Sequence, residues 1–569
     1  MGDCADQWRA QERRNLWGVT PRVLRLPLEG GAAEAVQSSL QAGCLTTGCT
    51  AGPGLLLMLP QMIQIADQSL RCVFHVAART VANSAGLIFG DYSDLVAAQW
   101  AGWAMLFGAS VQEAHDLAFL SQMATLDSGV PFLHVFDGFR TSHEQARISL
   151  LTPSDMLALL PEYAMQRQPV AADSKNCADL LQRAMERFAL HTGRVYHAYQ
   201  YVGDARAERV IVAMGSACQT IAETVEALNL RGESVGLLLV RLFRPLDTQA
   251  MLRALPQTCS RLAVLDRCAE SGTVAEPLYE DLVAVLAQDG RPMHISGGRY
   301  GLANHEFTPA MVAAVFAELA KPAPRARFTV GLGEDEGPLS LSYDRNWILE
   351  DPESVRAILW CLGSDGSLQD SLRILGEATD QYAQGYFVSD SDVTVAHLRF
   401  GPRPLRKPYL IQRASFVAVH QFALLTRFAV LDSLECGGTV LLNCPFDQEE
   451  VWERLPGWFR RQVLDQKLEV YGIDAQRLAL DLGLEGIDLV MQISFFYLSG
   501  VVSQSHSMSL LKEAWADSGL KTAAAIDAVC ENLRAVPIGP SPRPGEEVPP
   551  PDNRSKFLVT QRALATSLS

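Results

Sequence analysis

The chain has 569 residues, which is too long for one hydrophobic core and predicts about three or four domains. Its hydrophobic content of 48% with 20% charged residues is typical of a soluble globular protein. The net charge of -16 without a clustered basic segment excludes a nucleic-acid partner, because phosphate binding needs a basic surface.

The longest apolar stretch near the start, residues 54–66, is interrupted by Pro60 and Gln61. It is shorter than the roughly 20 residues that span a bilayer, so we expect a buried helix and no membrane partner. The first residues lack a secretory pattern, and Asp6 stands where a myristoylation motif has Ser or Thr. We therefore expect an intracellular location, in the cytoplasm or an organelle matrix.

The 12 cysteines are scattered, and no two have the Cys-x-x-Cys spacing that iron–sulfur or zinc sites use. The sequence therefore predicts no iron–sulfur cluster and no metal site in this chain. We interpret most of these cysteines as small buried hydrophobic residues in a reducing compartment.

Short apolar runs at 72–77 and 130–136 alternate with helical patterns at 95–107 and 111–126. The same rhythm continues with runs at 209–216, 234–240 and 261–266 and a helical pattern at 217–230. Alternating β and α patterns predict an α/β fold with largely parallel sheets flanked by helices. A new strand–turn–helix unit begins near Tyr199, and Pro-rich segments lie at 321–327 and 537–551. We therefore predict domains at 1–195, 196–325 and 328–535, followed by a Pro-rich linker or tail at 536–569.

Several sequence blocks carry a resemblance to a known family. The first two are His75-Val-Ala-Ala-Arg79-Thr80 and Phe132-Leu-His-Val-Phe-Asp137-Gly-Phe-Arg140. Colinear blocks follow at 209–216, 265–267, 297–302 and 383–387. Over roughly residues 21–535 the chain resembles the pyruvate:ferredoxin (flavodoxin) oxidoreductases.

The resemblance implies three domains. Residues 1–195 would be an N-terminally shortened thiamine-diphosphate pyrimidine-binding domain, 196–325 a transketolase C-terminal-like domain II, and 328–535 a gamma-type domain III. Family chains are about twice as long and carry the diphosphate site and the iron–sulfur clusters in later domains, so the Pro-rich tail resembles a severed connection to them.

Two residues match family site residues. Glu29 matches the glutamate that bonds the aminopyrimidine ring of thiamine diphosphate, and Arg79 matches the arginine that binds the substrate carboxylate. The alternatives from the residues alone are a glutamate that favours a helix N-terminus and an arginine in a surface ion pair. Arg79 follows an apolar strand, which is where ligands gather in parallel sheets.

A Gly-rich turn in the third domain corresponds to the family loop that cradles coenzyme A. This chain has Gly363, Ser364, Asp365 and Gly366 there, in a loop about three residues shorter and without the family's Asn-Lys. The family's Pro-Ile-Thr-Pro-Ser-Ser loop, which supplies a substrate-contacting threonine, has no counterpart.

Other polar residues have structural interpretations. We expect ion pairs for the charged residues on loops, namely Asp91, Asp94, Asp137, Arg140 and His143. We expect core histidines bonded to backbone within the strand patterns, namely His75, His134 and His397.

The family reaction is the oxidative decarboxylation of pyruvate with coenzyme A to acetyl-coenzyme A and CO2, with electrons passed to ferredoxin or flavodoxin. The resemblance implies thiamine diphosphate shared with missing domains, a small 2-oxo acid as ligand, a partner chain with the remaining sites, and a homodimer as a further assembly. Three hypotheses stay open: a component of a split enzyme, a noncatalytic scaffold or regulatory relative, and an α/β binding protein of unrelated function. The sequence does not decide the electron acceptor, the 2-oxo acid or the oligomeric state.

Overall fold

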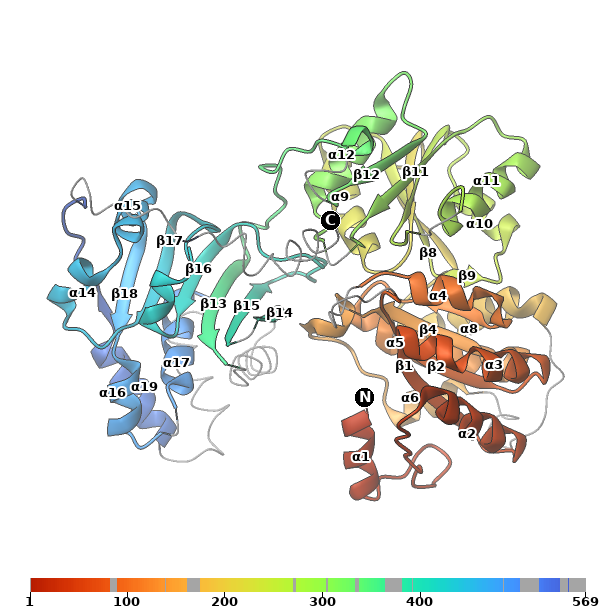
Figure 1. The fold of residues 1–569 in the computed structure, drawn as a ribbon, viewed down its shortest axis with the longest axis horizontal. Coiled ribbons are helices and arrows are strands. Elements are labelled where there is room, and N and C mark those ends of the chain that lie inside the picture. Colours follow the sequence, from red (N-terminus) through yellow and green to blue (C-terminus); the bar gives the residue numbers. More distant parts are fainter. Residues whose placement is uncertain are drawn as a thin grey trace, which may run out of the picture. The chain divides into compact units, whose positions relative to one another are not determined.

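The computed structural model describes residues 2–81, 90–138, 140–160, 174–269, 273–302, 305–332, 337–363, 381–390, 392–484, 486–501, 521–542 and 551. Its strands form three sheets of five, six and eight strands. Contacts divide the chain into two compact units (Figure 1). Unit 1 holds residues 1–142, 148–347 and 406–409, and unit 2 holds residues 143–147, 348–405 and 410–569.

The first sheet of unit 1 has the strand order β1-β2-β4-β3-β9. Its first four strands are parallel and β9 is antiparallel to β3. The strands are β1 (Thr46–Ala51), β2 (Cys72–Ala78), β3 (Ala104–Phe107), β4 (Phe132–Asp137) and β9 (Leu242–Arg244). Helices that precede or follow them are α1 (Gly2–Ala10), α2 (Glu29–Gln41), α3 (Pro53–Asp67), α4 (Ser93–Ala98), η1 (Gln99–Ala101), α5 (Val111–Ser128), η2 (Thr141–His143), α6 (Pro153–Leu159), η3 (Ser174–Asn176) and α8 (Cys177–Thr192).

The predicted helix at 95–107 is wrong in its second half. The helical part ends at Gly102, whose φ of +77° is left-handed, and residues 104–107 form the fully buried strand β3. A short apolar run of this kind fits a buried strand as well as a buried helix, so periodicity alone could not separate the two.

The second sheet of unit 1 has the order β12-β11-β10-β7-β8-β6, parallel except for β6. Alternate residues of β7 enter different cores, with Ile211 facing the layer of α9 and α12 and Val210 facing that of α10 and α11. Figure 1 shows these helix pairs on opposite sides of the sheet. The elements are β6 (Tyr199–Gly203), β7 (Arg209–Ala213), α9 (Ala217–Leu230), β8 (Val235–Val240), α10 (Thr248–Ala254), β10 (Arg261–Asp266), α11 (Pro277–Asp289), β11 (His294–Tyr300), α12 (Pro309–Ala320), β12 (Arg327–Val330) and η5 (Gly337–Leu339).

The sheet of unit 2 is mixed, with the order β19-β18-β17-β16-β13-β15-β14-β5. Strands β13, β16, β17 and β18 are parallel, whereas β5, β14, β15 and β19 pair antiparallel. Its elements are β5 (Glu144–Ala146), β13 (Val355–Leu362), β14 (Tyr382–Asp390), β15 (Val393–Gly401), β16 (Ala414–Val419), η6 (Phe422–Thr426), β17 (Leu434–Asn443), α14 (Gln448–Arg454), α15 (Gly457–Gln466), β18 (Glu469–Ile473), α16 (Ala475–Asp481), α17 (Asp488–Ser499), α19 (Lys521–Asn532) and β19 (Arg534–Ala535). Helices cover both faces, since Leu359 packs with α16, α17 and α19 and Trp360 with η6, α14 and α15.

The α/β class with three helix-flanked sheets is confirmed, although the third sheet is less parallel than predicted. Two strands also cross the predicted domain boundaries. β9, from predicted domain 196–325, extends the first sheet, and β5, from predicted domain 1–195, extends the third. The boundaries themselves stay predictions. Among the described residues, no helix has both the length and the apolar character that crossing a membrane requires.

Candidate functional site

A tight turn at the carboxyl end of β1 forms the base of the candidate site. β1 ends at Ala51, and Gly52 has φ +54° and ψ −130°. This conformation suits glycine because an L side chain there would be strained. α3 then begins at Pro53, whose fixed φ and missing N–H are compatible with a first helical position.

Glu29 is half-buried at the start of α2 and lies directly against this turn. A Cβ built on Gly54 would be 3.0 Å from Glu29 Cγ and 3.2 Å from Glu29 Oε1, and 3.0 Å from Thr50 Oγ1. Only a glycine at position 54 allows this approach. Within the described part of the chain, no group donates a hydrogen bond to the Glu29 carboxylate.

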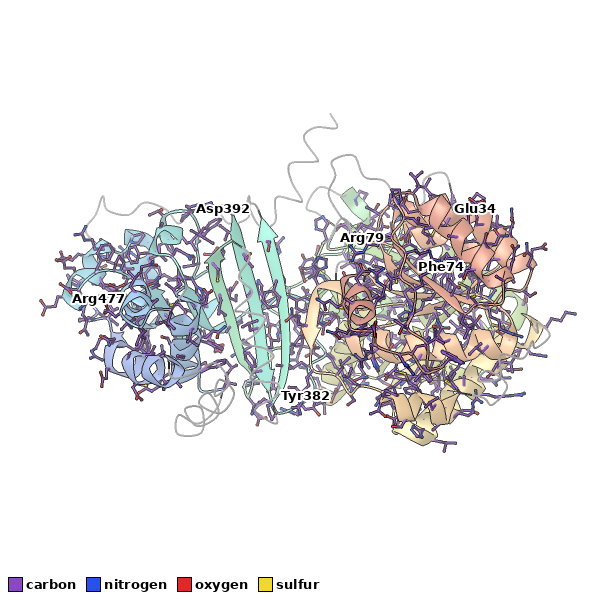
Figure 2. The ribbon with its side chains drawn as sticks, turned by 90° about the horizontal axis from the view of Figure 1, so that it is seen from below. Glu34, Phe74, Arg79, Tyr382, Asp392 and Arg477 are labelled. Carbon is purple, nitrogen blue, oxygen red and sulfur yellow. The ribbon has the colours of Figure 1, made fainter. Side chains whose placement is uncertain are left out.

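Arg79 approaches the same turn from the neighbouring strand. It follows β2, which pairs in parallel with β1, and its Cβ is 3.4 Å from a Cβ built on Gly52. Its Cγ lies 2.7 Å from a Cβ built on Gly138, after β4. Its Nε is buried and has no hydrogen-bond partner among the described residues. Figure 2 labels Arg79 together with Phe74 of β2, and Glu34 of α2.

Glu29 and Arg79 therefore contact opposite ends of one turn, residues 52–54. An anion-binding guanidinium and a half-buried carboxylate lie at the carboxyl edge of parallel strands, where open sheets bind ligands. Such a pair can hold a carboxylate ligand at one end and exchange a proton with a ring nitrogen at the other.

Asp94 joins the two loops behind this turn. Its Oδ2 accepts hydrogen bonds from the backbone N–H of Gly52 and of Arg79, both at 3.0 Å. Its Oδ1 accepts from Leu95 N–H at 2.8 Å. Burial and the nearby Asp91 carboxylate raise the pKa of Asp94 to about 7, against the lowering effect of these N–H donors.

The predicted ion pairs are partly right. Asp137 pairs with Arg267 at 3.2 Å, and Arg140 pairs with Glu306. Asp91 and Asp94 instead accept hydrogen bonds from backbone and hydroxyl groups, because they sit beside loops whose N–H groups need acceptors. His143 ends η2.

The two histidines of the first sheet, half-buried His75 and buried His134, bond to each other. His75 and His134 are in register on β2 and β4, and their Nδ1 atoms are 3.0 Å apart. The prediction of backbone partners is therefore wrong for this pair. It is right for His397, whose Nδ1 accepts from Ile411 N–H at 3.3 Å. Burial lowers the pKa of His75 to about 4 and that of His134 well below its usual value.

The predicted coenzyme A loop is only partly visible. Gly363 follows β13 with φ +80°, and its carbonyl accepts from Thr394 Oγ1 at 2.6 Å. Ser364, Asp365 and Gly366 lie outside the described residues. In the described ranges no group of three or more His, Cys, Asp or Glu side chains could hold a metal ion.

Sequence reasoning missed the part that Asp94, Gly52 and Gly54 play at the turn. The run Gly52-Pro53-Gly54 directly after a strand is a signal for a tight strand-to-helix turn. Asp94 gave no such signal, because its two partners are 15 and 42 residues away in the sequence.

Comparisons with known families cover most of the chain. Residues 1–211 match the family described as pyruvate flavodoxin/ferredoxin oxidoreductase, thiamine diphosphate-binding. Residues 207–309 match pyruvate:ferredoxin oxidoreductase core domain II, and residues 376–537 match pyruvate ferredoxin/flavodoxin oxidoreductase.

Individual relatives agree with these matches. A pyruvate-flavodoxin oxidoreductase of Trichormus variabilis is 45% identical over 90% of this chain and 46% of its own length. A pyruvate:ferredoxin oxidoreductase of Moorella thermoacetica is 43% identical over 90% of this chain and 47% of its own length. The chain thus spans about half the length of the relatives it matches. A solved 2-oxoglutarate:ferredoxin oxidoreductase of Magnetococcus marinus aligns over 53% of this chain and 58% of its own, with 16% identity and a TM-score of 0.37, a likeness too low to argue from.

Proposed function

Because the chain belongs to the pyruvate:ferredoxin/flavodoxin oxidoreductase family, we propose that it is the cofactor-activating and substrate-binding component of a 2-oxo acid oxidoreductase. The reaction is the coenzyme-A-dependent oxidative decarboxylation of pyruvate to acetyl-coenzyme A and CO2. The electrons leave through iron–sulfur clusters on a partner chain or further domains, toward ferredoxin or flavodoxin. The length of the relatives supports this division, since they are about twice as long as the matched region.

The observation that carries the proposal is the convergence of Glu29 and Arg79 on the 52–54 turn, each with a polar group that no described residue satisfies. The Arg79 Nε nitrogen is buried, and a buried donor without a partner is costly unless a ligand meets it, whereas the half-buried Glu29 carboxylate stays open to a ligand. The residues therefore fit the aminopyrimidine of thiamine diphosphate on one side and a small carboxylate on the other.

Thiamine diphosphate, when bound, supplies the electron sink for decarboxylation of a 2-oxo acid. Glu29 would hold a proton shared with the pyrimidine ring nitrogen, which is the acid–base function that a half-buried carboxyl serves. The absence of a side chain at Gly54 leaves room for the carboxylate beside the turn, where the ligand would meet it.

Arg79 would bind the carboxylate of the 2-oxo acid. Two parallel N–H donors of a guanidinium fix both the charge and the plane of a carboxylate. We further propose coenzyme A as cosubstrate, with Gly363 and the following Ser364, Asp365 and Gly366 as its loop.

Variants of the two residues separate these roles. In the chain purified with its native partners, we expect Glu29→Gln to lower kcat for pyruvate-dependent viologen reduction roughly 10²- to 10⁴-fold. Glu34→Gln is the matched control, because Glu34 lies exposed on the same helix and undergoes the same chemical change. Equal activity of the Glu29 and Glu34 variants would contradict the acid–base assignment.

Arg79→Ala tests substrate binding. We expect KM for pyruvate to rise by about 10- to 100-fold, because a charge-assisted pair of hydrogen bonds is lost. Arg477→Ala, at an exposed arginine of α16, should leave KM unchanged. A drop in kcat with constant KM would assign Arg79 to another step.

A further inference from the structure

The segment Asp91–Asp94 contacts each of the loops that surround the candidate site. Asp91 accepts from the N–H and hydroxyl of Ser93, and Ser93 Oγ accepts from Val81 N–H at 2.9 Å. The Tyr92 hydroxyl donates to Asp137, the last residue of β4, at 2.6 Å. Asp94 holds the loops after β1 and β2. Four residues thus connect the exits of three parallel strands.

Asp94 is the member that bonds both to Arg79 and to the turn that Glu29 lies against. One oxygen, Oδ2, accepts from Gly52 N–H and Arg79 N–H, so these two amides are held on a single atom. Gly52 belongs to the turn that contacts Glu29, and the other amide belongs to Arg79 itself. The side chain of Asp94 is fully buried. Its position is therefore set by the fold and not by solvent.

Asp94 bonds to Arg79 only through the backbone N–H of Arg79. Asp94 is absent from the ion pairs of the described residues, and the Arg79 Nε nitrogen keeps no hydrogen-bond partner there. A carboxylate that paired with the guanidinium would compete with a substrate carboxylate. Asp94 instead fixes the main chain and leaves the cation available.

We propose that Asp94 is a positioning residue that sets the separation between the cofactor-side carboxylate of Glu29 and the substrate-side guanidinium of Arg79. It does so by holding the Gly52 and Arg79 amides on one carboxylate oxygen. The kinetic part of this inference rests on the proposed function, whereas the coupling of the two loops does not. We call the bonds from Asp94 Oδ2 to these two amides the Asp94 clamp. A displacement of about 1 Å at a reacting centre costs up to about 10²-fold in rate, so loss of the Asp94 clamp should lower turnover.

The test compares Asp94→Ala with a matched control, Asp266→Ala. Asp266 is also a buried carboxyl, and it accepts from two backbone amides, Leu278 N–H at 3.2 Å and Tyr279 N–H at 3.1 Å. Its bonds lie within the second sheet layer, at the start of α11. Both variants remove a buried acceptor of two amides, but only the Asp94 change releases the two site loops.

In the complex purified with native partners, we expect Asp94→Ala to lower kcat/KM for pyruvate about 10- to 100-fold, and Asp266→Ala to change it less than about twofold. Asp94→Asn should recover part of the loss, because one amide oxygen can still accept both N–H groups. If Asp94→Ala fails to fold, Asp94→Ser against Asp266→Ser gives the same comparison, because the shorter serine hydroxyl no longer reaches both amides at either site. Equal kcat/KM for the Asp94 and Asp266 variants would overturn the proposal.

Backbone hydrogen exchange tests the clamp without activity. Peptides that cover residues 50–56 and 77–81 should exchange about tenfold faster or more in Asp94→Ala, and should be unchanged in Asp266→Ala. Unchanged exchange in both peptides of Asp94→Ala would overturn the clamp. If the wild-type complex lacks pyruvate activity, the proposed function fails, and the exchange result alone confirms or overturns the coupling of the two loops.

Discussion

At the scale of single residues, the site depends on contacts that a sequence pattern shows only in part. The position of Arg79 after an apolar strand indicated the ligand-binding edge of a parallel sheet, whereas Glu29 was singled out by the family resemblance. The pattern could not show that Glu29 lies against Gly54 or that Gly52 contacts Arg79, because these approaches depend on how α2 and β2 meet the turn. The roles of Glu29 and Arg79 stay proposals.

The histidine pair shows a similar limit. Alternation within β2 and β4 indicated buried histidines, but register alone decided that His75 and His134 are neighbours. Each neutral imidazole has one donor and one acceptor, so one Nδ1–H can donate to the other Nδ1. Backbone groups within the strands already bond across the ladder, which leaves the two rings to each other.

We predict that this pair makes the protein sensitive to acid. The pKa of His75 is lowered by burial to about 4, whereas an unfolded histidine titrates near pH 6.5. Between these values the unfolded chain binds more protons, so the free energy of unfolding falls as pH drops from about 6.5 to 4. For His75 this amounts to about 1–2 kcal/mol between pH 7 and pH 5, and His134 acts in the same direction.

Urea unfolding from pH 7 to 5 measures this effect. The double variant His75→Gln with His134→Gln should show a smaller acid loss than the wild type. Parallel pH profiles for the two proteins would show that the histidines do not carry the effect. Burial acts in the opposite direction on Asp266, whose pKa it raises to about 7, so only the difference between the two proteins is diagnostic.

At the scale of elements, the turn between β1 and α3 is the feature on which the site is built. A positive φ at Gly52 ends the strand, and Pro53 begins the helix. The sequence Gly-Pro-Gly predicts a turn of this kind, whereas the position of α2 across it does not follow from local sequence.

Substitution of Gly52 tests whether the turn between β1 and α3 positions the site. Gly52→Ala should cost more than the roughly 1–2 kcal/mol of a left-handed α position, because φ +54° with ψ −130° is a conformation that only glycine adopts without strain. It should also lower kcat/KM for pyruvate. Gly290→Ala is the control, since Gly290 has φ +77° and open space around it at the end of α11.

Both glycine variants should lower the thermal unfolding midpoint, Gly52→Ala by more than Gly290→Ala, because Gly290 lies in the left-handed α region with open space around it. Only the Gly52 variant should lose kcat/KM beyond its loss of folded protein. Similar kinetic losses in both would assign the effect to stability and not to the turn.

In the third sheet, the sequence pattern predicted the positions of strands but not their directions. Apolar runs at 357–363, 393–399 and 437–443 indicate strands, and the structure has β13, β15 and β17 there. The antiparallel pairing of β14 and β15 could not be predicted, because a short connection between them allows a hairpin and apolar alternation does not report strand direction.

At the scale of the whole molecule, two strands show that sequence segments and sheets do not coincide. Glu144 of β5 accepts from Tyr386 Oη at 2.7 Å and from Gln384 Nε2 at 2.8 Å within unit 2. In the sequence, however, β5 comes soon after β4 of the first sheet. Boundaries drawn at changes in composition cannot detect an edge strand that pairs more than 200 residues away. The class of fold was predictable because the alternation of strand and helix repeats along the chain.

The central claim is that this chain supplies one part of a 2-oxo acid oxidoreductase and that its site acts through Glu29. The most direct test is pyruvate-dependent viologen reduction by the tagged chain isolated from its native cells, with mass spectrometry of the proteins that copurify. We expect a copurifying partner with diphosphate-binding and iron–sulfur domains. We also expect pyruvate-dependent activity that is lost in Glu29→Gln and kept in Glu34→Gln. A wild-type complex without activity, or activity that survives Glu29→Gln, would contradict the account and favour a noncatalytic relative of the family.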